Sequence, residues 1–150
     1  TLGLTAPVQA QDSWRTYENS LFGYSVLVPP RFIRDGETAE GRGQRFRGRP
    51  ATYQVDGLLI SGSLSAEAIR RASLLRADGW RIIHRRHDVE SDAWAELSAE
   101  KEGRNLRIRM IRLCDPTQIA TLEFEYLARD SWRITMMPEI ISRSFRSRDC

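Results

Sequence analysis

A hairpin signal at Glu102-Gly103 constrains the fold of this chain more than any other feature. Apolar and polar residues alternate in 93–101 and again in 104–113, and a two-residue turn containing glycine joins such strands tightly. Because this turn pairs Lys101 with Arg104, it determines which residues share a face. The pairs expected on the apolar face are Ala99–Leu106, Leu97–Ile108 and Ala95–Met110, and those on the polar face are Ser98–Arg107 and Glu96–Arg109. The chain is therefore expected to contain an antiparallel sheet with a buried face.

A third strand, 119–127, follows the turn Asp115-Pro116-Thr117 and alternates in the same way. Aligning its apolar face with that of the hairpin predicts Glu123 beside Arg109 and Glu125 beside Arg107. A neighbouring arginine keeps a carboxylate ionised, so this face is expected to hold surface ion pairs rather than acid–base groups. The apolar residues of this strand are Leu122, Phe124 and Tyr126.

The other strands are predicted from aromatic and β-branched runs at 24–28, 44–47, 51–61 and 80–85. The glycine-rich, charged segment 34–43 is predicted to be a loop. A helix is expected after Ser65, its N-cap, up to Gly79. A second helix is expected after the cap Thr135, with Pro138 in its first turn. The residues expected on the buried helix faces are Ala68, Ile69, Ala72 and Leu75, then Met137, Ile140, Ile141 and Phe145.

Three segments resemble PsbP-like domains. Residues 17–29 (YENSLFGYSVLVP) are similar to the opening of those domains, and 140–145 (IISRSF) to their last helix. Phe46 and 53–57 resemble the second and third strands of small bacterial exported members, and the order of elements agrees. The resemblance implies an α+β fold, a mainly antiparallel sheet with helices on its faces (a PsbP-like α/β/α sandwich). It also implies a single PsbP-like domain over 11–150.

The function implied by the resemblance is binding or assembly. Members include extrinsic subunits of photosystem II, a Ran-binding import factor and bacterial envelope proteins, which are mostly not enzymes. A shared fold does not transfer a function, and the resemblance assigns a role to no residue of this chain.

The first ten residues are interpreted as the remnant of a secretory signal peptide. Leu2 to Ala6 is apolar, and Val8-Gln9-Ala10 supplies small residues at the positions that signal peptidase requires. Export to the periplasm or secretion is the localisation that follows, with the mature chain beginning at Gln11. The alternative is an unstructured N-terminal tail. No apolar run in the sequence is long enough for a membrane span.

The two cysteines, Cys114 and Cys150, fit an oxidising compartment, in which they can form a disulfide. Closing a loop of about 36 residues would stabilise the fold by roughly 3–4 kcal/mol. Two free thiols, or pairing of Cys150 between chains, are the alternatives.

A basic segment at 41–49 contains four arginines around an aromatic residue and is a candidate anion-binding site. Its arginines are Arg42, Arg45, Arg47 and Arg49, with Phe46 among them. For an exported protein the partner would be an anionic lipid or a polysaccharide rather than nucleic acid. A solvated, flexible loop is the alternative interpretation. The abundance of arginine also follows from a GC-rich coding bias, because Lys101 is the only lysine among 23 basic residues.

Catalytic and metal-binding motifs give no assignment. No serine lies in a G-x-S-x-G turn, and no glycine loop has phosphate-binding spacing. His84 and His87 lie three apart on a predicted strand and therefore face opposite sides. No catalytic residue, metal site or cofactor is assigned.

The function expected from the sequence is an exported, non-catalytic binding or accessory domain of the cell envelope, whose partner is another envelope protein. The first alternative is a protein that binds anionic lipid or polysaccharide through the 42–49 arginines. A small hydrolase is the second alternative.

Overall fold

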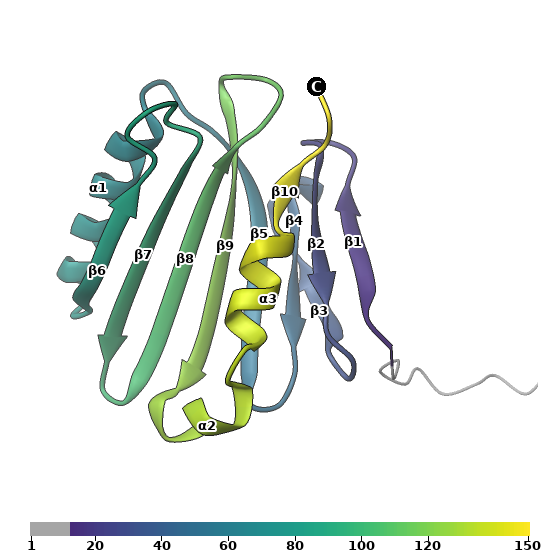
Figure 1. The fold of residues 1–150 in the computed structure, drawn as a ribbon, viewed down its shortest axis with the longest axis vertical. Helices are drawn as coiled ribbons and strands as arrows, with labels where there is room; N and C mark the ends of the chain where they lie inside the picture. Colours follow the sequence, from purple (N-terminus) through teal and green to yellow (C-terminus); the bar gives the residue numbers. More distant parts are fainter. Residues whose placement is uncertain (1–12) are drawn as a thin grey trace, which may run out of the picture.

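A computed structural model describes residues 13–150, and the signal-peptide interpretation of residues 1–10 falls outside them. The fold is α+β, as the sequence predicted: two antiparallel sheets with helices against their faces (Figure 1). The small sheet has the order β1 (Arg15–Asn19), β2 (Tyr24–Val28), β10 (Arg146–Ser147). The large sheet has the order β3 (Ile33–Glu37), β4 (Gly43–Arg47), β5 (Ala51–Leu59), β9 (Gln118–Leu127), β8 (Arg104–Arg112), β7 (Trp94–Lys101), β6 (Arg81–His87). The helices are α1 (Leu64–Ala77), α2 (Ser131–Ile134) and α3 (Met137–Ser144).

Helix α1 covers one face of the large sheet over β6, β7 and β8. Its apolar stripe packs on the alternating residues of the hairpin, so that Leu97 and Ile108 are buried beneath it. The hairpin register is the one predicted from Glu102-Gly103, with Leu97 opposite Ile108 and Glu96 opposite Arg109. This side of the sheet is called the α1 face below.

The small sheet and α3 cover the opposite face, over β3, β4, β5 and β9. Aromatic side chains dominate this second core: Phe46, Tyr53 and Phe124 stack in a row across β4, β5 and β9. The Tyr53 hydroxyl donates a hydrogen bond to the Leu27 carbonyl at 2.8 Å, which joins the two sheets.

Strand β9 has the opposite phase to the one predicted. Glu123 lies opposite Ile108, and Leu122 lies opposite Arg109. The prediction that Glu123 and Glu125 flank Arg109 and Arg107 is therefore wrong. The physical reason is that the cover changes sides: β8 buries its apolar residues under α1, whereas β9 buries Leu122 and its neighbours on the other face.

The predicted start of α1 is two residues late. The Ser63 side chain, not that of Ser65, accepts a hydrogen bond from the Ala66 amide at 3.0 Å. The carboxylate of Asp92 accepts from the Leu64 amide at 2.7 Å and completes this N-terminus. The side chain of Ile69 was expected on the buried face, but it is half exposed.

Two other predictions differ from the structure. Residues 33–37 form an edge strand instead of a loop, because β3 pairs with β4. Thr135 does not cap the C-terminal helix, which begins at Met137 without a side-chain cap. Thr135 instead ends the short helix α2 with a φ of +22°.

The C-terminus is tied to the end of β8. Cys114 and Cys150 lie at disulfide distance, with their Cα atoms 5.5 Å apart. The Arg148 amide donates to the Gly23 carbonyl at 2.9 Å, so the last residues are held against the small sheet.

Candidate functional groove beside helix α1

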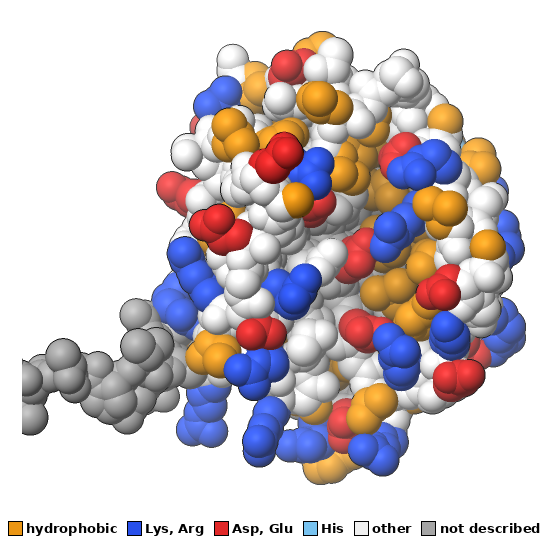
Figure 2. Space-filling view, turned by 180° about the vertical axis from the view of Figure 1, so that it is seen from behind, with side chains coloured by type: hydrophobic (Ala, Val, Ile, Leu, Met, Phe, Trp, Pro, Cys, Tyr) orange, Lys and Arg blue, Asp and Glu red, His pale blue; other side chains and the backbone are white. Residues whose placement is uncertain are grey.

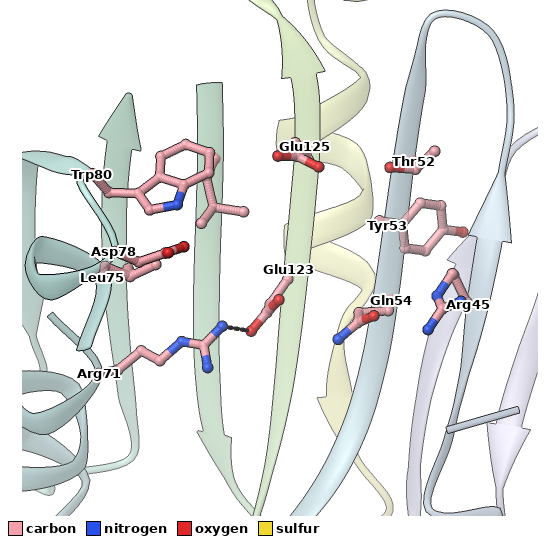
Figure 3. A pocket seen from close by; sticks show the side chains of 11 residues that line it. Arg45, Thr52, Tyr53, Gln54, Arg71, Leu75, Asp78, Trp80, Glu123 and Glu125 are labelled. Carbon is pink, nitrogen blue, oxygen red and sulfur yellow. Dashed lines mark hydrogen bonds and ion pairs between the residues drawn. The ribbon is translucent and has the colours of Figure 1, made fainter. Parts of the chain in front are cut away.

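Helix α1 covers only half of one face of the large sheet, and the small sheet lies on the opposite face. Half of the α1 face is therefore open. Over β4, β5 and β9 most of the alternating residues on this face are polar, and of these strands only Ile119 and Leu58 join the apolar core beneath α1. A groove lies where this polar half meets α1, with a hollow of about 340 Å³ (Figure 3). Figure 2, the view from behind, shows acidic and basic side chains interspersed along a hollowed surface on this face.

One wall of the groove is apolar and the floor is charged. Leu75, Trp80 and Leu106 form the wall, and each is buried. Glu123 and Gln54 project from the sheet as the floor (Figure 3). A neighbouring hollow of about 280 Å³ continues along α1 past Leu74 and shares part of this floor. A surface that combines apolar walls with a few polar groups is typical of a binding site.

An ion pair between Arg71 of α1 and Glu123 of β9 crosses the groove (Figure 3). Burial raises the pKa of Glu123, and the Arg71 guanidinium opposes this effect only in part. The Nε of Arg71 is buried without a hydrogen-bond partner in the structure. The pair joins helix and sheet by charge across the groove.

Trp80 closes the far end of the groove with a stacked arginine. The Arg104 guanidinium lies 5.2 Å from the centroid of the Trp80 ring and also pairs with Glu125. The ring face attracts a guanidinium placed over it at this distance.

The four arginines singled out from the sequence do not form one flexible cluster. Arg45 and Arg47 alternate with the buried Phe46 along β4, so both lie on the α1 face. Arg45 lines the groove, whereas Arg42 lies 3.9 Å from Asp56 and Arg47 lies 3.5 Å from Asp35. Arg49 is exposed in the β4–β5 turn. The role of these residues in anion binding stays a prediction.

Two other observations concern chemistry and membranes. His84 lies opposite Ser98 and His87 opposite Ala95, so the two imidazoles are on different faces of the sheet. Within residues 13–150, no cluster of three histidine, cysteine or acidic side chains could hold a metal ion. In the same range, no helix has the length and apolar character needed to cross a membrane.

The groove could not be found from the sequence alone. Arg71 belongs to a helix and Glu123 to a strand, and 52 positions separate them in the sequence. The missing information was the phase of β9, which places Glu123 on the α1 face.

No protein-family model and no curated protein matches the chain. Among solved structures, cyanobacterial PsbP from Synechocystis sp. PCC 6803 is similar, with a TM-score of 0.69 and 15% identity. That match covers 97% of this chain and 98% of the other. The Ran-binding protein Mog1p of Saccharomyces cerevisiae has a TM-score of 0.65 at 12% identity, covering 91% of this chain and 96% of Mog1p. Identity this low shows the fold alone, and the chain therefore has the PsbP-like α+β fold, which Mog1p shares.

Proposed function

We propose that this protein is an exported, non-catalytic binding or accessory domain of the cell envelope. Its groove beside α1 would hold a segment of another envelope protein. The observation that carries the proposal is the open polar half of the sheet, hollowed where it meets the apolar wall of α1. The proposal is supported by Mog1p, a Ran-binding protein, because it has the same fold and binds another protein.

The chemistry of the groove favours binding over hydrolysis. Glu123 is the groove carboxylate with a raised pKa, and a general acid or base must reach its substrate. Its carboxylate is instead held by Arg71. A polypeptide segment suits both surfaces of the groove, because its apolar side chains can pack on Leu75 and its polar groups can pair with the floor.

Site-specific photo-crosslinking tests the proposal. A benzophenone amino acid replaces Leu74, which is half exposed beside the hollow that continues the groove along α1, in cells that export the protein. We expect a crosslink to one envelope protein. The variant Gln54→Trp, which fills the floor, should abolish the crosslink, and Ser98→Trp on the opposite face should retain it. A crosslink that persists with Gln54→Trp would contradict binding in the groove.

Export has its own test. The small residues at Val8 and Ala10 and the pair Cys114–Cys150 both suit a secreted chain. Mass spectrometry of the protein exported from its full-length gene should show a mature chain that begins at Gln11. A mature species that retains residues 1–10 would refute the signal-peptide interpretation.

A further inference from the structure

Several connections of the fold lie at one end of the sheets, the lower end in Figure 1, including the β7–β8 turn with its exposed Glu102, and three of these connections carry exposed arginines. These three are the β2–β3 turn, the β4–β5 turn and the segment from the end of β9 through α2. The register places them together, because Ile33 lies opposite Arg47 and Ala51 lies opposite Tyr126. We call the surface formed by Arg31, Arg49, Arg129, Trp132 and Arg133 the basic end.

Cations on the basic end lack acidic partners. Arg31, Arg49 and Arg129 are exposed, and within residues 13–150 none of them forms an ion pair. Arg133 has only a long pair to Asp130, at 3.6 Å. Figure 2 shows basic side chains gathered at this lower end.

The opposite end of the molecule carries exposed side chains of both charges. The β6–β7 connection, the β8–β9 connection and the C-terminal residues all lie at the upper end in Figure 1. Their exposed acidic residues are Glu90, Asp115 and Asp149, and the C-terminal residues also include the exposed Arg146 and Arg148. An anionic surface attracts the end of a molecule that has the larger excess of unpaired cations, so the basic end is the one expected to face it.

Two exposed apolar side chains lie near the arginines of the basic end. The side chain of Trp132 in α2 is 73% exposed, and that of Met136, just after α2, is 55% exposed. Exposed tryptophan next to arginine is typical of protein surfaces that contact a membrane interface, because the indole ring partitions to the headgroup level. A polysaccharide would engage the arginines but has no apolar layer to receive these side chains.

We propose that the basic end docks on an anionic phospholipid surface, with its arginines at the headgroups and Trp132 at the interface. The three connections lie at the ends of the strands, whereas the groove runs along the face of the sheet beside α1. The protein can therefore lie on the membrane with the groove still accessible. This docking does not depend on the occupant of the groove.

Vesicle binding tests the docking with the residue 11–150 chain. Flotation compares phosphatidylcholine vesicles with vesicles that also contain phosphatidylglycerol, at low and at high salt. We expect binding only to the anionic vesicles, with loss at high salt. The variant Arg49→Ser/Arg129→Ser should lower the partition coefficient roughly 25-fold, since each arginine contributes about a factor of five. The control Arg85→Ser/Arg146→Ser changes the net charge equally elsewhere and should retain binding.

Variants of Trp132 distinguish binding to a lipid surface from binding to a polysaccharide. On binding anionic vesicles, tryptophan fluorescence should shift to the blue in the unaltered protein and not in Trp132→Phe. Trp132→Ala should weaken vesicle binding and leave retention on heparin unchanged. The proposal is overturned if the unaltered protein ignores anionic vesicles, if both arginine double variants lose binding equally, or if Trp132 makes no difference.

Discussion

Two glutamates on opposite faces of the same sheet have pKa values shifted in opposite directions. Burial raises the pKa of Glu123, and a single arginine does not offset that effect. Burial also acts on Glu96, but hydrogen bonds and charge from Arg86 and Arg109 outweigh it and lower the pKa. Burial acts on both glutamates, but the carboxylates of Asp56 and Glu125 raise the pKa of Glu123 further, whereas Glu96 has two arginine partners that lower its pKa.

The two glutamates should therefore respond oppositely to pH. A raised pKa in the folded state means that the stability Glu123 contributes is present at acidic pH and lost as pH rises through that pKa. Relative to the unaltered protein, Glu123→Gln should become more stable from pH 4 to pH 7. Glu96→Gln should become less stable over the same range, since the contribution of Glu96 is present above its unfolded pKa and lost on acidification. Urea unfolding at several pH values measures both, and equal slopes for the two variants would contradict the assignments.

At the residue scale the sequence predicts which side chains share a face of a strand better than it predicts which face is buried. The spacing of Arg45, Phe46 and Arg47 is that of a strand, so Phe46 is necessarily on the face opposite the arginines. Which face is buried depends on elements elsewhere in the chain, namely the small sheet and α3. Treating the three residues as one basic–aromatic patch was therefore wrong, because Phe46 is in the core.

At the scale of elements, the hairpin was predictable because its turn is local. Glu102 and Gly103 both have positive φ, at 49° and 76°, as a type I′ turn requires. Once that turn is given, the partner of every residue in β7 and β8 follows by counting. Strand β9 follows a looser connection, so its phase had to be inferred from apolar matching, which failed where the cover changes sides.

The hairpin turn is a site at which stability can be gained. Glutamate is strained at the positive φ of position 102, whereas asparagine is favoured there. Glu102→Asn should therefore raise the free energy of unfolding by about 0.5–1 kcal/mol, within the range that turn optimisation commonly yields. Chemical denaturation measures it. Gly103→Ala, which adds a Cβ at positive φ, should lower stability, and the opposite ranking of these variants would contradict the turn geometry.

At the scale of the whole molecule, the disulfide is expected to matter more than any single surface contact. It closes a loop of 36 residues that includes β9 and α3. Cys114→Ser/Cys150→Ser should lower the free energy of unfolding by about 3–4 kcal/mol on the loop-entropy model. Denaturation of the double variant, compared with the oxidised protein, measures this. A loss below 1 kcal/mol would mean that the C-terminus is held by its other contacts.

Both faces of the large sheet are covered over only half their width, and this arrangement creates the groove. The α+β class, the helix–sheet order and the cysteine pair could be anticipated from residues near one another or from composition. The groove depends on α1 and the small sheet lying on opposite faces, which no local pattern in the sequence encodes. Arg71 and Glu123 become neighbours only through that arrangement.

A set of double-mutant cycles on Glu123 tests this arrangement most directly. The residues are replaced by alanine singly and in pairs, and the free energy of unfolding is measured by urea denaturation. The account predicts a coupling of about 0.5–1 kcal/mol between Glu123 and Arg71 and none between Glu123 and Arg109, with Glu96–Arg109 as the positive control. Coupling of Glu123 to Arg109 instead of Arg71 would place Glu123 on the other face and contradict the groove.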